Sequence, residues 1–103
     1  MKIVRPHQLQ DQLVFIQVYA PDRYRPRHQT TNALAFAEAF AGLEYFKGQT
    51  PTTEGKEAIQ QCIRNLHVAF ELYEHGDNIR ASATVQETGE MFRKARKYID
   101  TED

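Results

Sequence analysis

The 103-residue sequence predicts an all-α protein, a compact bundle of three or four helices. Three observations support this fold class. Apolar residues recur at intervals of three and four, recognisable cap and stop residues bound the periodic stretches, and the connections between them are short. The length fits one helical domain over residues 1–103, because independently folding units usually contain on the order of 100 residues.

The first element, from Pro6 to Ala20, carries two competing patterns. One is a helical stripe made of Leu9, Leu13, Ile16 and Ala20. The other is the run LVFIQVY, whose β-branched and aromatic residues are typical of strands. A strand here would need a partner, and 79–85 is the only internal candidate. We expect helix, and the alternative is an α+β fold with short strands near residues 13–19 and 79–85.

A second helix is expected over ALAFAEAFAGLEYFK, with Thr31 or Asn32 as its cap and Gly48 as its terminator. The expected buried stripe is Leu34, Ala37, Phe40 and Ala41, widened by Phe36, Leu43 and Phe46. So many apolar positions imply contacts on more than one side of the helix. The small alanines would let a neighbouring helix approach closely.

The third helix has the best-defined boundaries. Thr50 is expected to cap it, Pro51 suits the first helical position, and Gly76 is a good left-handed stop. Its apolar seam is Ile59, Ile63, Leu66, Phe70 and Tyr73. Cys62 lies beside this seam, so we expect its thiol to pack as a small apolar group.

The last element runs from Ile79 to Ile99. Its helical seam is Ala81, Val85, Thr88, Phe92, Ala95 and Ile99. Its first half also alternates as a strand would, and Gly89 disfavours a helix by ~1 kcal/mol relative to alanine. We expect a helix, which completes the bundle.

Composition excludes several classes of protein. With 41% hydrophobic and 26% charged residues, the chain has the balance of a globular domain. The single cysteine cannot form an internal disulfide, and no segment approaches the ~20 apolar residues that span a bilayer. We therefore expect a cytoplasmic protein that does not enter the membrane. Ser82 is the only serine, and no glycine-rich phosphate loop is present, so we expect neither an enzyme nor a cofactor.

The stretch DRYRPRH, residues 22–28, is called here the arginine connector. Arg23, Arg25 and Arg27 alternate in it with Tyr24, Pro26 and His28. It has three interpretations. The arginines could bind phosphates while Tyr24 or His28 stacks on a base, they could meet carboxylates at a protein interface, or they could pair with carboxylates of the bundle in a plain connector.

A second basic region lies near the C-terminus, in MFRKARKYI. Cations in a final helical turn complement the helix dipole, and Glu90 can pair with Lys94 at the favourable i,i+4 spacing. If this region met the arginine connector in space, their positive fields would add. The nucleic-acid alternative therefore uses Arg23, Arg25, Arg27, Arg93, Lys94 and Lys97.

A second alternative is a small metal-dependent protein. His67, Glu71 and His75 fall at successive i+4 positions on one helix flank, so they could in principle share an ion. The HExxH signature is absent, because its glutamate follows the first histidine directly. Local side-chain pairing is the alternative role for these residues, and we expect no bound metal.

The first functional hypothesis is a non-enzymatic macromolecular binding or regulatory protein that acts through an apolar and aromatic surface as a homodimer. It is motivated by a surplus of large apolar residues in the first two helices, since aromatic residues left unburied would form a patch suited to association. The expected partner is a protein. The expected partner-binding residues are Tyr19, Arg23, Tyr24, Arg25, Arg27, Tyr45 and Phe46.

Overall fold

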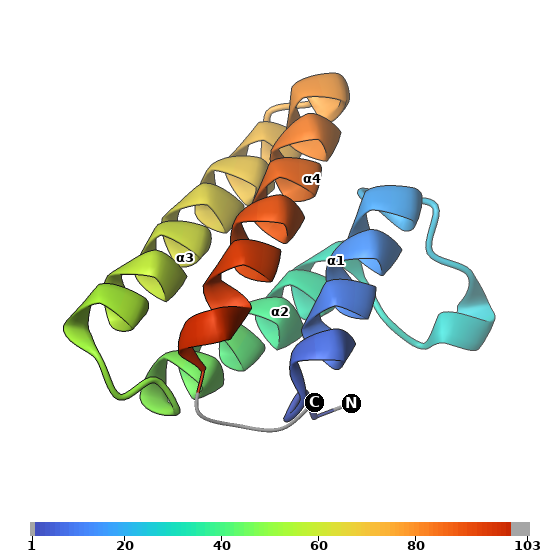
Figure 1. Ribbon diagram of the computed structural model, residues 1–103. Coiled ribbons are helices and arrows are strands. Elements are labelled where there is room, and N and C mark those ends of the chain that lie inside the picture. Colours follow the sequence, from blue (N-terminus) through green and yellow to red (C-terminus); the bar gives the residue numbers. More distant parts are fainter. Residues whose placement is uncertain (1, 100–103) are drawn as a thin grey trace.

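The computed structural model describes residues 2–99, and within that range it contains four α-helices and no strand. The helices are α1 (Pro6–Tyr19), α2 (Asn32–Gly48), α3 (Thr53–Glu74) and α4 (Asn78–Ala95), with short 3-10 turns at Pro26–His28 and Arg96–Tyr98. Figure 1 shows them as one bundle. The predicted all-α fold is confirmed. The α+β alternative is wrong, because residues 13–19 belong to α1 and residues 79–85 to α4.

Helical spacing decides the structure of α1, although its residues favour strands. The helix buries Leu9, Leu13 and Ile16 on one face and leaves Val14 and Val18 on the outer face. A strand would alternate these side chains between two faces and would find no partner strand in an all-helical bundle. Burial of the three large side chains outweighs the local preference.

Threonines set the boundary between α2 and α3, but not in the predicted way. Thr52 caps α3, where its Oγ1 accepts a hydrogen bond from the Gly55 amide at 3.0 Å. The predicted cap, Thr50, is wrong. Its side chain is 1% exposed and donates to the Phe46 carbonyl at 2.7 Å, so it satisfies the end of α2 instead of the start of α3. In the short linker between the two helices, Thr50 therefore satisfies the end of α2 and Thr52 caps the start of α3.

The other boundaries follow the sequence closely. Thr31 caps α2, accepting from the Leu34 amide at 3.2 Å. Gly76 adopts φ +80°, which confirms the predicted left-handed stop after α3. Asp77 then caps α4 by accepting from the Arg80 amide.

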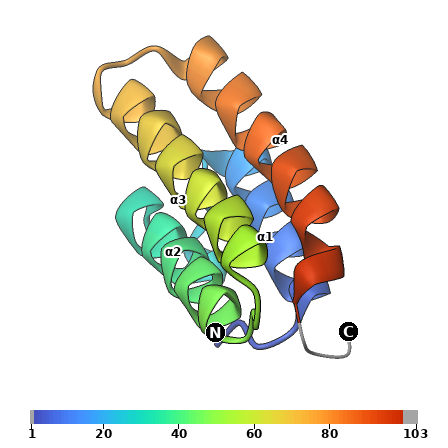
Figure 2. The ribbon, with the colours of Figure 1, turned by 60° about the vertical axis from the view of Figure 1, so that its left-hand side comes forward.

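Each helix packs against the next, and α4 also packs against α1 (Figures 1 and 2). Asn65 of α3 donates to the Thr88 hydroxyl of α4 at 3.0 Å, and Gln10 of α1 donates to the Gly89 carbonyl of α4 at 3.2 Å. These bonds fix the register of α4 against both neighbours. The main core side chains are Leu9, Leu13, Ile16, Phe36, Leu43, Phe46, Ile59, Cys62, Leu66, Val85 and Phe92.

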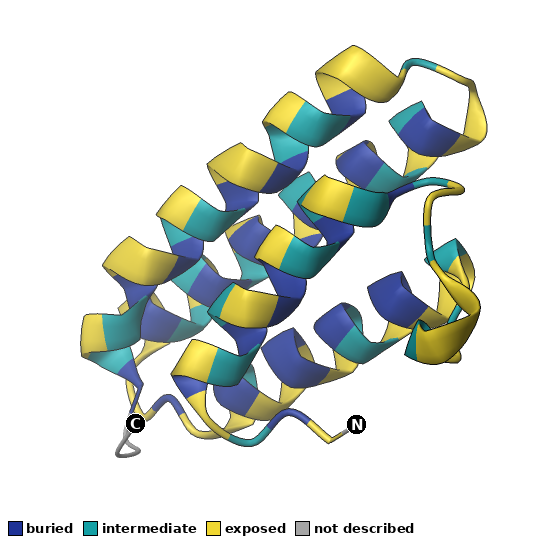
Figure 3. Ribbon diagram, turned by 90° about the vertical axis from the view of Figure 1, so that its right-hand side faces the viewer, coloured by how far each residue is buried: buried dark blue, intermediate teal, exposed yellow. Residues whose placement is uncertain are grey.

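The core of the bundle uses a different face of α2 from the one predicted. Figure 3 shows the buried positions directed inward on every helix. On α2 these positions include Phe36, Leu43 and Phe46, which were expected only to widen the stripe. The expected centre of the stripe is wrong: Leu34, Ala37 and Ala41 are exposed and Phe40 is half-buried. Because α2 is apolar on both sides, hydrophobicity alone could not select its inner face.

Candidate functional site

The connection between α1 and α2 is held against the bundle by four rings. This aromatic cluster consists of Phe15, Tyr19, Tyr24 and His28. The ring centroids of Phe15 and Tyr19 are 5.1 Å apart, and His28 lies 4.6 Å from Tyr19 and 5.1 Å from Phe15. Tyr24 packs 5.6 Å from Phe15. Two rings come from α1 and two from the arginine connector, so the cluster ties the connector to the helix.

Hydrogen bonds add to this anchoring. The Tyr24 hydroxyl donates to Asn32 Oδ1 at 2.9 Å, and the Arg25 amide donates to His28 Nδ1 at 3.0 Å. Since Nδ1 accepts, a neutral His28 carries its proton on Nε2. Burial, reinforced by the nearby Tyr73, raises the pKa of Tyr24 well above its ordinary value. The tyrosine therefore stays a neutral donor.

The three arginines of the connector are exposed, and the charge of Arg23 also acts on the hydroxyl of Tyr73. Arg23, Arg25 and Arg27 are exposed, and none of them forms an ion pair with a carboxylate among residues 2–99. The ion pairs that the plain-connector interpretation expected are therefore absent from the described part of the chain, although the segment is an exposed connector between α1 and α2 as that interpretation expected. Three guanidinium groups on an anchored segment are thus left without a carboxylate partner in the described part of the chain.

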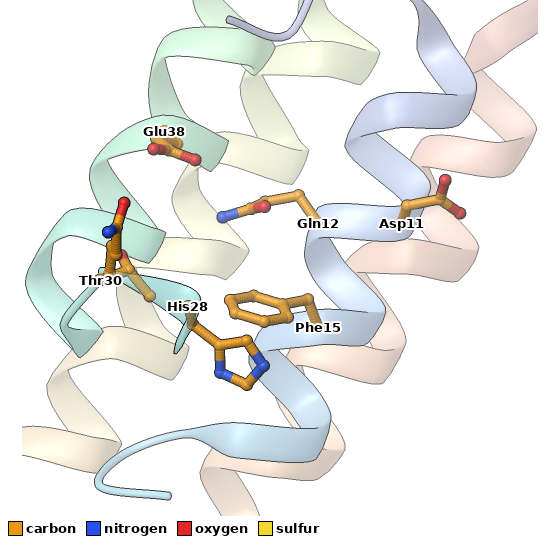
Figure 4. A pocket seen from close by; sticks show the side chains of 7 residues that line it. Asp11, Gln12, Phe15, His28, Thr30 and Glu38 are labelled. Carbon is orange, nitrogen blue, oxygen red and sulfur yellow. The ribbon is translucent and has the colours of Figure 1, made fainter. Parts of the chain in front are cut away.

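An open pocket of about 540 Å³ lies between α1, the connector and α2 (Figure 4). Gln12 extends into this space from α1, and its Nε2 donates to the Ala35 carbonyl at 2.9 Å. The rings of Phe15 and His28 form an aromatic wall. The pocket is lined by Asp11, Gln12, Phe15, His28, Gln29, Thr30 and Glu38.

The pocket brings aromatic and polar side chains together. Its lining combines an aromatic wall, amide groups and the carboxylates of Asp11 and Glu38, and it includes neither a cysteine nor a serine. Figure 4 shows the Asp11 carboxylate directed away from Gln12, so the carboxylates do not converge on one reacting atom. The carboxylates of Asp11 and Glu38 oppose any anionic group in the pocket, phosphate or carboxylate.

The two basic regions are not brought together. Gln10 contacts Gly89, so Arg93 lies one turn from that level toward the N-terminal end of α1, while the connector follows Tyr19 at the other end. At 1.5 Å per residue these points are about 20 Å apart along the bundle. That distance exceeds the Debye length of ~8 Å at physiological salt, so the two fields do not add. The predicted Glu90–Lys94 pair is also wrong, because Glu90 pairs with Arg93.

The proposed metal-ligand set does not form. His67 stacks on Phe40 with ring centroids 4.1 Å apart, and His75 Nδ1 lies 2.8 Å from the backbone oxygen of Glu71. Within residues 2–99, no group of three or more His, Cys, Asp or Glu side chains could hold a metal ion. The metal alternative is therefore contradicted at these residues: His67 packs against an aromatic ring, and His75 bonds locally.

The expected partner-binding residues do not lie together on one surface. Tyr19 and Tyr24 are half-buried in the aromatic cluster beside the arginines, while Tyr45 lies near the far end of α2. Phe46 is wrong as a surface residue, because it is 0% exposed and contacts Phe92 at 5.7 Å between ring centroids. The aromatic surface is therefore smaller than the sequence suggested, since most of these rings stabilise the bundle itself.

Sequence reasoning missed the polar side of the pocket and the outer face of α2. Asp11, Gln12 and Glu38 come from two helices, and no spacing within the chain signals that they meet. On the outer face of α2, Leu34, Ala37 and Ala41 were assigned to the core, and only Tyr45 was expected at the surface.

Within residues 2–99, no helix is both long and apolar enough to cross a bilayer. The chain matches no protein-family model, and comparisons with curated proteins and with solved structures give no match either.

Proposed function

We propose that this protein is a non-enzymatic binding protein that recognises an acidic segment of a protein partner through the arginine connector. The observation that carries the proposal is the contrast within this segment. Its rings are anchored to α1 and α2, whereas Arg23, Arg25 and Arg27 are exposed and form no ion pair with a carboxylate of residues 2–99. Planar guanidinium groups meet carboxylates with two parallel hydrogen bonds, which suits such a partner.

Anchoring matters because binding loses free energy whenever it orders a flexible segment. Ordering each rotamer-rich side chain costs roughly 0.5–1.5 kcal/mol, and backbone ordering adds to this. The aromatic cluster and the Tyr24–Asn32 hydrogen bond restrict the connector backbone before a partner arrives. Within the connector, the ordering cost that remains is that of the arginine side chains.

Two features favour a protein partner over a nucleic acid. The rings of Tyr24 and His28 are occupied within the aromatic cluster, so neither is free to stack on a base. The C-terminal basic region is too distant to extend a phosphate-binding track. The nucleic-acid alternative therefore becomes the contrary outcome of the test.

We further propose that the protein works in the cytoplasm as a homodimer. A lone, buried Cys62 needs no disulfide-forming compartment. The outer face of α2 exposes Leu34 and Tyr45, and burying such an apolar face is a common basis of subunit association.

The test compares two triple variants that each remove three positive charges. The connector variant replaces Arg23, Arg25 and Arg27 by alanine. The C-terminal variant, the matched control, replaces Arg93, Lys94 and Lys97 by alanine. Chemical cross-linking and capture from cells of the source organism should recover a protein with wild type and the C-terminal variant, but not with the connector variant. Capture that survives in the connector variant, or salt-sensitive binding of a labelled oligonucleotide, would overturn the proposal.

A further inference from the structure

Helix α2 is apolar on two opposite faces, and only one of them is covered by the bundle. The inner face buries Phe36, Leu43 and Phe46. The opposite side, called here the α2 outer face, consists of Leu34, Ala37, Ala41 and Tyr45. Leu34 is 54% exposed and Tyr45 is 38% exposed. Positions at spacings of three and four share one side of a helix, so these residues form a continuous stripe that no described segment covers.

The order of side chains in this stripe is nearly symmetric. Reading along the helix, it runs large, small, small, large. Ala37 and Ala41 stand two residues on either side of residue 39, while Leu34 and Tyr45 stand five and six residues away from it. A two-fold axis that passes between two copies of α2 at the level of residue 39 would therefore place Ala37 of one copy against Ala41 of the other. It would also place Leu34 of one copy near the end of the other that carries Tyr45. This is the condition that a self-complementary interface must satisfy.

A hollow beside the stripe fits the same arrangement. It has a volume of about 310 Å³ and is lined by Lys2, Ile3, Glu38, Ala41, Gly42 and Tyr45. Rotation about the axis at residue 39 brings Leu34 of a second copy to the level of residue 44, next to Ala41 and Tyr45. An exposed leucine thus faces an apolar hollow, and the central alanines allow the two helices to approach closely.

Charges on the neighbouring helix support an antiparallel second copy. Lys47 Nζ contacts Gln60 Oε1 at 2.7 Å and Phe40 stacks on His67, which fixes the register of α3 beside α2. In this register Arg64 lies about one turn from the level of residue 39 toward the C-terminal end of α2, and Glu71 lies about one turn from it toward the N-terminal end. Both are exposed. The two-fold rotation therefore brings Arg64 of each copy to the same level along the bundle as Glu71 of the other, whereas a parallel arrangement would bring like charges to the same level.

We propose that the α2 outer face is the interface of an antiparallel, two-fold symmetric homodimer, with the two α2 helices crossing near residue 39. This inference rests on the homodimer in the proposed function and identifies the surface that forms it. The occupant of the face is a second copy of this chain. Glu44 lies five residues from the axis, so its two copies are about 15 Å apart and repel weakly. Glu38 lies one residue from the axis, and repulsion between its copies limits the affinity of the dimer.

The test uses charge placed at the two central alanines. Ala37→Lys and Ala41→Glu each put a charged side chain into the apolar centre, and each should reduce the mass in sedimentation equilibrium from twice the 12.0 kDa chain mass to the chain mass. In the double variant, the introduced lysine faces the introduced glutamate of the other copy only in the antiparallel register, so the dimer should be restored. Ala83→Glu, at an exposed position of α4, is the control and should remain dimeric. Circular dichroism checks that each variant is folded.

Three outcomes would overturn the inference. They are a monomeric wild type at high micromolar concentration, a dimer that Ala41→Glu leaves intact, and a double variant that stays monomeric. The connector variant is expected to remain dimeric, since it leaves the α2 outer face unchanged. A failure of partner capture is therefore read separately from a failure of dimerisation.

Discussion

The phenolic hydroxyl of Tyr24 donates a hydrogen bond to Asn32 Oδ1 at 2.9 Å, which joins the arginine connector to the first turn of α2. The same ring packs 5.6 Å from Phe15 of α1. One residue between Arg23 and Arg25 is therefore held by both helices that the connector joins. Its two neighbours owe their fixed starting positions to this arrangement.

Replacing Tyr24 by phenylalanine isolates the contribution of the hydrogen bond. The ring contacts remain, but the part-buried Asn32 side chain loses its donor, so the free energy of unfolding should fall by about 1 kcal/mol. Urea denaturation measures this change. Tyr45→Phe on the exposed side of α2 is the control, with an expected change within about 0.5 kcal/mol. Equal stability of Tyr24→Phe and Tyr45→Phe would contradict the anchoring role.

Gly55 lies in the first turn of α3, where this turn packs against Tyr98 in the 3-10 turn that follows α4. A Cβ atom at this position would come within 2.4 Å of Thr50 Cγ2 and 2.6 Å of Tyr98 Cβ. Gly55→Ala should therefore lower the free energy of unfolding by about 1–3 kcal/mol, although alanine favours a helix interior. The matched control is Gly48→Ala, whose Cβ would meet nothing within 4 Å. If both variants were as stable as wild type, the packing described around Thr50 would be wrong.

The burial of Cys62 in the core predicts that the free energy of unfolding falls at alkaline pH. Burial raises the pKa of its thiol to about 11, from an ordinary value of 9.0. A pKa raised by folding favours the neutral native thiol, so this contribution is complete below pH 9 and is lost as the pH rises toward 11. The expected loss is about 2–3 kcal/mol, from 1.36 kcal/mol per pKa unit. Denaturation midpoints of wild type and Cys62→Ala between these pH values measure it, and the variant should show the smaller decline.

The same burial predicts slow chemical modification. At pH 8 iodoacetamide should leave Cys62 unmodified in the folded protein and alkylate it after denaturation, because the thiolate is the reactive form and the side chain is 0% exposed. Mass spectrometry reads the adduct directly. Rapid labelling of the native protein would show that the α3 seam opens around this residue.

The sequence was sufficient to predict the helices, because caps and periodicity agreed over most of the chain. Thr31, Gly48 and Gly76 all lie where the sequence placed a boundary. The cap of α3 was predicted wrongly because two threonines precede this helix, and only the packing of the linker shows that Thr50 closes α2 while Thr52 opens α3. Local rules rank capping residues but do not choose between neighbours of the same type.

The inner face of α2 could not be predicted for a related reason. Helix α2 is apolar on two opposite faces, and the choice between the side of Leu34 and the side of Phe36 depends on which one meets α1 and α3. Three residues of the stripe assigned to the core, Leu34, Ala37 and Ala41, belong instead to the exposed face that we propose a second copy covers. In the candidate site, the exposed arginines were found from sequence, whereas the pocket formed with Gln12 and Glu38 depends on tertiary contacts alone.

The most direct measurement is the dissociation constant of the captured protein partner for wild type, the connector variant and the C-terminal variant at one salt concentration. We predict that the connector variant binds at least tenfold more weakly, a loss of about 1.4 kcal/mol or more, while the C-terminal variant binds as wild type does. Equal affinity of wild type and the connector variant would contradict the role of Arg23, Arg25 and Arg27 in partner recognition.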